Sequence, residues 1–268
     1  MKIVRHRNPQ GASEWAALDP DGPARRIVGD LLSDYEVTSE TVTLGPLLTP
    51  IEPGTILCIG LNYRRHAEET GARIPQRPVL FMKPPVTRQH PGAPIELPRH
   101  LASDRVDFEG ELAVIIGRSG KNISRERAFE HVLGYTCAND VSARDWQKDF
   151  GGSQWCRGKG FDTFCPLGPC LVTPDEIPDP STLTLRTIVS GEVMQESPLS
   201  DLIFDIPTII EFLSGSTTLE AGTVILTGTP SGVGMARTPP RWLAPGDTVT
   251  VEIDGIGALT NPVVEEPI

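Results

Sequence analysis

Glycine and proline divide most of this chain into short apolar segments, and this punctuation constrains the fold more than any other feature. The 268 residues include 26 glycines and 26 prolines. Residues 56–59, 111–116 and 224–227 are apolar runs that each end at or beside a glycine, as short buried strands do. Residues 248–254 alternate polar and apolar side chains before an Asp254–Gly255 turn, which is typical of a half-buried strand. The chain is therefore predicted to be rich in β-structure.

Helical signals are fewer. We expect helices over residues 24–32, over residues 124–133 with Ser124 as the cap, and over residues 206–213. The third has Asp205 as a plausible cap and Pro207 in its first turn. Because helices do not alternate regularly with strands, a doubly wound fold is disfavoured and a β-rich α+β domain is expected.

The segment Leu-Gly-Pro-Leu-Leu-Thr-Pro-Ile-Glu-Pro at residues 44–53 reads as a domain connection. Its prolines resist both a helix and an inner strand. We therefore expect a small N-terminal domain over residues 1–52 and a catalytic domain over residues 53–268.

The overall charge argues against polyanionic partners. The formal net charge is −11 and the pI is about 4.9, which disfavours nucleic acid and anionic membrane surfaces. No apolar run is long enough to cross a bilayer, and the N-terminus lacks the apolar stretch of a secretory signal. Five cysteines without a C-x-x-C pair suggest reduced thiols, and hence a cytoplasmic protein.

The segment Asp-Phe-Glu-Gly-Glu at residues 107–111 is the first that suggests chemistry. In a strand, Glu109 and Glu111 would share a face, and two adjacent carboxylates repel each other unless something positive lies between them. A hard divalent cation is the simplest solution, because Mg²⁺, Mn²⁺ and Ca²⁺ prefer oxygen ligands. Taken alone, the pair fits the solvated face of an edge strand at least as well.

Two further segments are dense in polar groups. In residues 139–147, Asp140 could supply a third carboxylate, while Arg144 or Gln147 could hold an anion. That segment is equally well described as an Asx-type turn before a helix. Lys159 stands between two glycines and could face a ligand, although most lysines are solvated surface groups.

His66 and Glu69 form a candidate general-base pair. If a helical turn begins after residue 60, their spacing of three places both side chains on one face, where the carboxylate can orient the imidazole. A histidine on a surface helix more often has no catalytic role. Residues 227–234 form a Gly/Pro turn that lacks the lysine of a phosphate-binding loop, and Thr229 could line a pocket there.

In this order along the chain, these segments closely resemble the fumarylacetoacetate hydrolase family. The resemblance covers roughly residues 53–262 and is carried by G-L-N-Y-x-x-H at 60–66, F-M-K-P at 81–84, V-D-F-E-G-E-L-A-V at 106–114, N-D-V-S-A-R-D at 139–145, K-G-F-D-T at 159–163, P-L-G-P at 166–169 and L-T-G-T-P-S-G-V-G at 226–234. No single piece is decisive, but the ordered set is specific.

The resemblance implies a catalytic domain that is a mixed β-roll or sandwich, usually assembled as a homodimer. Glu109, Glu111 and Asp140 would be the metal ligands, with Mg²⁺ or Mn²⁺ as the metal and Ca²⁺ as a substitute. Lys159 matches the active-site lysine, and His66 with Glu69 matches the pair on a mobile lid. The expected substrate-binding residues are Lys83, Arg144, Gln147 and Thr229.

The activity that the resemblance implies is hydrolysis of a carbon–carbon bond in a small 2,4-dioxo acid. The products would be pyruvate or a related 2-oxo acid, and the partner would be a small anionic 2-oxo acid. His66, oriented by Glu69, would take a proton from water, and Lys159 would stabilise the departing enolate. The alternatives are decarboxylation of oxaloacetate-like acids or isomerisation of 2-hydroxymuconate-type intermediates on the same metal site. A non-catalytic metal-binding protein is the remote alternative.

Overall fold

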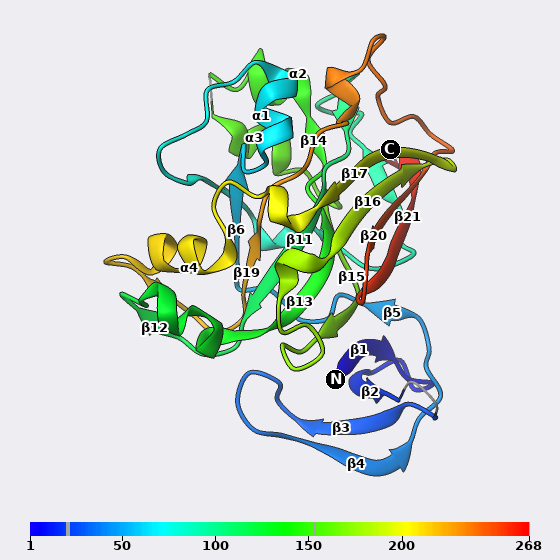
Figure 1. Cartoon of the computed structure of the whole chain (residues 1–268). Coiled ribbons are helices and arrows are strands. Elements are labelled where there is room, and N and C mark those ends of the chain that lie inside the picture. The colour runs from blue at the N-terminus through cyan, green and yellow to red at the C-terminus, as the bar shows by residue number, and fades with distance from the viewer. Residues whose placement is uncertain (20–21, 153, 268) are drawn as a thin grey trace.

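A computed structural model describes residues 1–19, 22–152 and 154–267 of the chain (Figure 1). Strands make up 41% of the residues and helices 17%, which confirms the β-rich α+β class. Among the described residues, no helix is both long enough and apolar enough to cross a membrane.

Within the described part of the chain, the largest sheet has twelve strands, and ten of them follow the order β4-β3-β2-β1-β15-β13-β11-β19-β6-β7. Neighbours on this path are antiparallel, except β19 and β6. The strands are β1 (Lys2–Arg7), β2 (Ser13–Leu18), β3 (Arg25–Gly29), β4 (Tyr35–Thr41), β5 (Leu47–Leu48), β6 (Thr55–Gly60), β7 (Val79–Lys83), β8 (Arg88–Gln89), β11 (Gly110–Ile116), β13 (Val132–Asn139), β15 (Cys165–Val172) and β19 (Thr223–Leu226).

A second sheet of five strands has the order β17-β16-β20-β21-β9. Two short ribbons pair β10 with β14 and β12 with β18. These strands are β9 (Ile95–Leu97), β10 (Val106–Asp107), β12 (Gly120–Lys121), β14 (Ser142–Ala143), β16 (Thr184–Val189), β17 (Glu192–Pro198), β18 (Thr218–Leu219), β20 (Thr248–Ile253) and β21 (Gly257–Glu265).

Strand β11 is buried on both faces, which explains the continuous apolar run that follows Glu111. On one face Leu112 packs in a cluster with Leu185 of β16 and Val251 of β20, so the second sheet covers the first. On the other face Ala113 joins a cluster that includes Ile3 and other side chains from β1, β6, β13, β15 and β19. Because strands from distant positions in the large sheet meet in this second cluster, the sheet is rolled.

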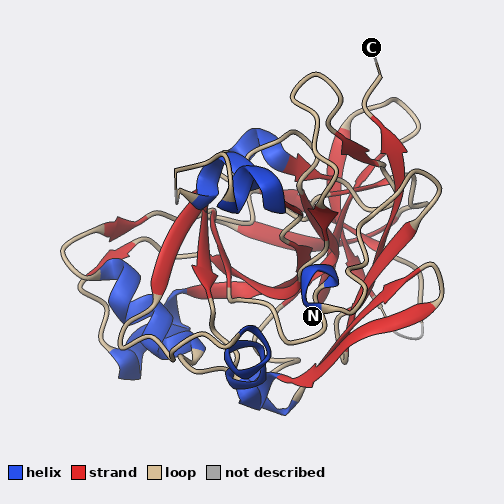
Figure 2. Ribbon diagram, turned by 90° about the horizontal axis from the view of Figure 1, so that it is seen from above, coloured by secondary structure: helices blue, strands red, loops and turns tan. Residues whose placement is uncertain are grey.

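Helices lie outside the strands (Figure 2). Three of them, α1–α3, gather at one end of the molecule, while α4 lies near the ribbon of β12 and β18 (Figure 1). The helices are α1 (Arg64–Thr70), α2 (Arg144–Lys148), α3 (Trp155–Lys159) and α4 (Ile206–Ser214), and the 3₁₀ turns are η1 (Pro85–Thr87), η2 (Arg125–His131), η3 (Pro180–Thr182), η4 (Leu199–Asp201) and η5 (Gly234–Ala236).

The expected helix over 206–213 is confirmed. Its cap, Asp205, accepts a hydrogen bond from the backbone N–H of Thr208 through Oδ1 at 3.0 Å. Pro207 lies in the first turn and the helix ends before Gly215. The capping residue, the proline in the first turn, the glycine at the end and the buried apolar face therefore all indicate the same helix.

One helix prediction is wrong, and another is confirmed only in part, since Ser124 precedes a 3₁₀ helix that ends at His131. Residues 24–32 contain strand β3, which pairs with β2 and β4, and a tight turn follows in which Ser33 N–H donates to Asp30 O. Ile27 and Leu31 are buried at a spacing that suits a helix, but pairing on both edges imposes the strand. Residues 124–133 form the 3₁₀ turn η2 and the start of β13, because residues from Val132 onward pair with β11.

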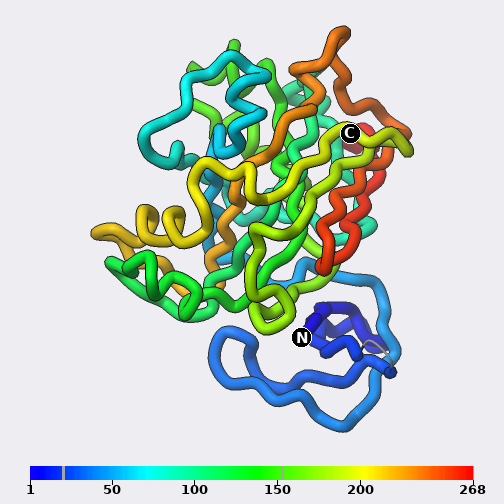
Figure 3. The backbone as a smooth tube through the Cα atoms, viewed as in Figure 1, coloured from blue at the N-terminus to red at the C-terminus, as the bar shows by residue number. Residues whose placement is uncertain are grey.

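The N-terminal strands β1–β4 form an arm at one end of the molecule (Figure 3). They nevertheless continue the large sheet, since Lys2 and Ile3 of β1 pair with Val172 and Leu171 of β15. The division of the chain into residues 1–52 and 53–268 stays a prediction.

Candidate active site and metal centre

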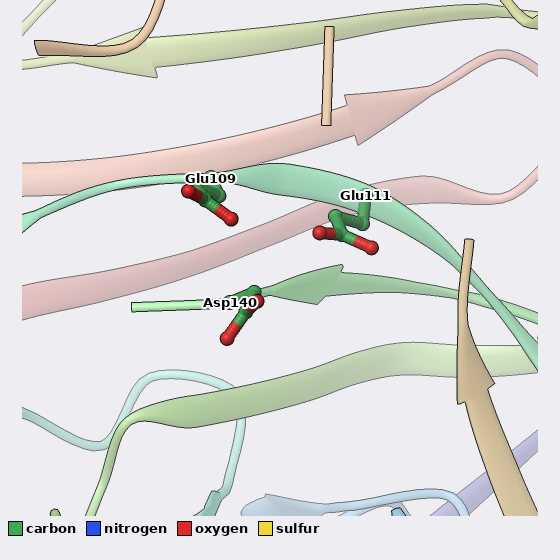
Figure 4. Close-up of side chains that lie close together, drawn as sticks. All are labelled: Glu109, Glu111 and Asp140. Carbon is green, nitrogen blue, oxygen red and sulfur yellow. The ribbon is translucent and has the colours of Figure 1, made fainter. Parts of the chain in front are cut away.

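Three carboxylates converge where β11 and β13 lie side by side (Figure 4). Glu109 directly precedes β11, Glu111 is its second residue, and Asp140 directly follows β13. The strands are antiparallel and Gly110 pairs with Asn139, so the start of one meets the end of the other. One oxygen atom from each carboxylate lies within 4.8 Å of the others, and all three side chains are buried.

Gly110 separates the two glutamates and leaves no space for a side chain. A Cβ atom added there would lie 2.0 Å from Oγ1 of Thr187. Its backbone N–H donates to Oε1 of Gln195 at 3.0 Å, and its carbonyl accepts from Oγ1 of Thr229 at 3.0 Å. Gln195 also donates from Nε2 to the Thr229 hydroxyl at 2.8 Å. The glutamates therefore stand on a backbone fixed from both sides.

Two buried lysines surround Asp140. Lys159 Nζ donates to Asp140 Oδ2 at 2.6 Å and to Glu109 Oε2 at 2.9 Å. Lys83 Nζ donates to the other oxygen, Oδ1, at 2.7 Å. Burial alone would lower the pKa of the Lys159 ammonium, but Asp140 and Glu109 raise it above its ordinary value. Lys159 is therefore held as a cation.

Glu111 is the least compensated of the three carboxylates. It accepts a hydrogen bond from the Gly228 N–H at 2.6 Å, while burial, and then Asp140 and Glu109, raise its pKa well above the ordinary value. Burial also raises the pKa of Glu109, but Lys159 and Arg144 lower it by more. A buried carboxylate beside two others needs a positive partner. Three converging oxygen donors suit a hard divalent cation, so these residues fit a metal centre.

His66 faces the same space from helix α1. Its Nδ1 lies 3.2 Å from Oε2 of Glu69. The other carboxylate oxygen of Glu69 accepts the Gly232 N–H at 2.9 Å, so one side chain joins the helix to the turn after β19. A carboxylate can only accept, so Nδ1–H donates a hydrogen bond to Glu69. The other ring nitrogen, Nε2, then carries a lone pair and can act as a base.

Arg144, the first residue of α2, links the carboxylates to a fourth acid. Its Nε donates to Asp107 Oδ2 at 2.9 Å, and its Nη1 lies 2.6 Å from Glu109 Oε1 and donates to Gln147 at 2.9 Å. Asp107 also accepts the N–H groups of Gly234 at 2.8 Å and of Met235. The guanidinium of Arg144 is therefore engaged mainly by residues of the protein and stabilises the site, instead of binding a ligand.

Glu109 and Glu111, with His66, Arg144 and Lys159, line one cavity of ≈ 260 Å³, while Asp140 and Glu69 stand behind this lining. That volume is slightly below the roughly 300–1,000 Å³ of pockets for drug-sized ligands, so a small molecule fits best. The lining combines apolar and polar side chains. The apolar ones include Ile59, Leu61, Phe81, Trp155 and Met235, and the polar ones are His66, Glu109, Glu111, Arg144, Gln147, Lys148, Lys159, Thr70 and Thr229.

The structure brings nearly all of the predicted site residues together. Asp140 completes the carboxylate group, and Glu69 stands behind His66. Lys83 differs from its prediction as a substrate-binding residue. It is fully buried, does not line the cavity, and directs its ammonium to Asp140 and to the carbonyl of Val141. Along strand β7 burial alternates, with Leu80 and Met82 exposed and Phe81 buried, so the alternation turns Lys83 inward as well.

Three contributing residues were missed from sequence. Asp107 lies in the V-D-F-E-G-E-L segment, but its role depends on contacts with Arg144 and with the distant residues 234–235. Gln195 comes from the second sheet and carries no local signal. Lys148 follows Gln147 directly, and its helical position four residues after Arg144 is the one signal that could have found it.

The sequence profile described as "Fumarylacetoacetate (FAA) hydrolase C-terminal" matches residues 55–264. The chain belongs to the fumarylacetoacetate hydrolase family. It is 48% identical to "Oxaloacetate tautomerase YisK" of Bacillus subtilis (strain 168) over 264 residues, covering 98% of this chain and 83% of that protein.

Two solved structures show the same fold. One is that of 5-carboxymethyl-2-hydroxymuconate delta-isomerase from Mycobacterium smegmatis, with a TM-score of 0.86 and 42% identity over 99% of this chain and 100% of that one. The other is fumarylacetoacetate hydrolase from Exiguobacterium antarcticum, with a TM-score of 0.87 and 36% identity over the same shares. Family enzymes are generally dependent on divalent metals, which agrees with the buried carboxylates.

Proposed function

We propose that this protein catalyses metal-dependent proton transfer at the carbon beside the 2-oxo group of a small 2-oxo acid, with keto–enol tautomerisation of oxaloacetate as the leading activity. The observation that carries the proposal is the position of His66. Its Glu69-oriented imidazole lines the same small cavity as the buried carboxylates and Lys159. An enolisation needs a base on one side of the carbon and positive charge near the oxygen.

Each residue has a separate task in this proposal. His66 Nε2 removes a proton from carbon and returns it, while Glu69 keeps Nδ1 protonated and the ring in place. Lys159 places a buried positive charge beside the enolate oxygen. The apolar side chains of Phe81 and Trp155 limit water next to the reacting carbon.

Glu109, Glu111 and Asp140 would hold the divalent cation. When bound, such an ion supplies a Lewis acid for the 2-oxo oxygen and positive charge for an anionic substrate. Mg²⁺ or Mn²⁺ is the expected ion, with Ca²⁺ as a substitute, because all three ligands are carboxylates.

Carbon–carbon hydrolysis becomes the second candidate. The relative at 48% identity is named as a tautomerase and the solved structure at 42% identity as an isomerase, and these names favour proton transfer over hydrolysis. The His66–Glu69 pair could also activate water for an acylpyruvate, and a relative at 36% identity is named as a hydrolase. Decarboxylation of oxaloacetate would use the same cavity. We further infer a homodimer in the cytoplasm, with no nucleic-acid or membrane partner.

The deciding experiment separates these activities in one enzyme preparation. EDTA-treated protein is assayed with and without Mg²⁺ or Mn²⁺, and each rate is corrected for the metal alone. Loss of enol absorbance from oxaloacetate reports tautomerisation, while pyruvate release from oxaloacetate or acetylpyruvate reports decarboxylation or hydrolysis. We expect tautomerisation to be the fastest and to disappear in Glu109→Gln. Faster pyruvate release from acetylpyruvate would restore the hydrolase, and absence of all three activities would contradict the proposal.

A further inference from the structure

Lys148 differs from every other basic side chain that lines the cavity. His66 pairs with Glu69, Arg144 with Asp107 and Glu109, and Lys159 with Glu109 and Asp140. In the described part of the chain, Lys148 forms no ion pair or hydrogen bond. It is thus the one lining cation whose charge is not already used by the protein.

The position of Lys148 follows from helix α2. It is the last residue of that helix, one turn beyond Arg144, so the two cations share a face. Arg144 is buried and reaches the carboxylates, whereas Lys148 lines the same cavity and is exposed, which places it at the solvent side. Burial, and then the charge of Arg144, lower the pKa of the Lys148 ammonium. A ligand carboxylate beside Lys148 would relieve both effects.

Glu109 and Glu111 line the buried side of the cavity, where the 1-carboxylate and 2-oxo group of a substrate belong under the proposed function. A small 2-oxo acid held there directs its far end toward the outer part of the cavity, and Lys148 is the free cation there. We propose that Lys148 binds the distal carboxylate of a dicarboxylic 2-oxo acid and selects diacids over monoacids. This inference rests on the proposed function and identifies the substrate class within it.

A matched pair of ligands tests the inference. Oxaloacetate and 2-oxobutyrate both have four carbons and a 2-oxo acid group, and they differ in that a carboxylate replaces a methyl group. Binding of each to Mn²⁺-loaded enzyme is measured by quenching of tryptophan fluorescence, since Trp155 lines the cavity. Tautomerisation of oxaloacetate is followed separately to obtain KM and kcat. The variants are Lys148→Met, which keeps the length of the side chain, and Lys148→Arg, which keeps the charge.

We expect Lys148→Met to weaken oxaloacetate binding and raise its KM about tenfold, the order expected for one partly exposed charged contact. The affinity for 2-oxobutyrate and kcat should change little, and Lys148→Arg should recover most of the loss. The control is Lys121→Met, an exposed lysine on β12 in a different part of the molecule (Figure 1).

Equal weakening of both ligands, or of neither, would overturn the role of Lys148. The role would also be overturned if Lys148→Met lost the preference for oxaloacetate and Lys148→Arg, which keeps the charge, lost it as well. If the wild-type enzyme binds oxaloacetate through Lys148 but does not tautomerise it, the proposed function fails and the binding role stands. If the enzyme tautomerises oxaloacetate and the Lys148 variants bind it normally, the proposed function stands and the binding role of Lys148 fails.

Discussion

Arg144 donates from Nε to Asp107 Oδ2 over 2.9 Å, and this ion pair is almost completely shielded from solvent. Asp107 uses both carboxylate oxygens as acceptors, for Arg144 and for the N–H groups of Gly234 and Met235. The pair therefore connects strand β10, which leads to Glu109, with helix α2 and with the turn whose Gly232 N–H donates to Glu69.

Replacing Asp107 by Asn should destabilise the protein by about 1.5–3 kcal/mol, because the buried Arg144 loses one of its two carboxylate partners and keeps only Glu109. Urea unfolding measures the change. Asp149→Asn is the control, since Asp149 pairs with Arg105 at 2.9 Å while both side chains are about half exposed. That surface pair should contribute less than about 1 kcal/mol. Similar losses in both variants would show that burial of the Asp107 pair is unimportant.

Replacing His66 by Ala should lower kcat by roughly 10²–10⁴-fold, the usual contribution of a general base. Glu69→Gln should lower it less, because the imidazole remains but loses its orienting charge. Metal affinity, measured by calorimetric titration of Mn²⁺, should be unchanged in both variants. A parallel fall in metal affinity would assign His66 to the metal centre instead.

Replacing Gly110 by Ala should cost about 1–3 kcal/mol through overpacking against Thr187. The double variant with Thr187→Ala should recover part of the loss, because it removes the hydroxyl that a Cβ would meet at 2.0 Å. Gly54→Ala is the control, since a Cβ there meets nothing within 4 Å. Thermal unfolding compares the four proteins, and an unaffected Gly110→Ala would disprove the close contact.

Replacing Asp205 by Ala should cost about 1 kcal/mol at neutral pH, as loss of a helix cap does. Burial raises the pKa of Asp205, but hydrogen bonds from Arg125 and Thr208 lower it by more, so the folded pKa is below the ordinary value. The contribution is therefore present above about pH 4 and is lost as the pH falls through the folded pKa. Urea unfolding across this range should show the two proteins converging in acid. A difference that grows in acid would contradict the assignment.

Much of the site could be predicted because its parts are local in sequence. The E-x-E spacing places Glu109 just before strand β11 and Glu111 within it, and the spacing of three places His66 and Glu69 on one helical face. The ordered motifs then indicate the family. The cap at Asp205 was equally local, and the structure confirms it.

What could not be predicted depends on contacts between distant segments. Residues 25–29 are a strand because β2 and β4 flank them, although their apolar spacing also suits a helix. The inward direction of Lys83 requires knowing that β7 forms the edge beside β6 and that Asp140 lies behind it. The role of Asp107 depends on backbone groups more than a hundred residues away.

The antiparallel pairing of Gly110 with Asn139 has a consequence for how such a site can diversify. A slip of one residue between β11 and β13 would turn the carboxylates to the opposite face of the sheet, so neither strand tolerates an insertion or deletion near residues 109–111 or 139–140. The end of α2 and the segment after α1 are not held by that ladder. New substrate preferences can therefore arise there by changes of side chain or of length, while the strand pair that holds the three carboxylates is inherited as a single unit.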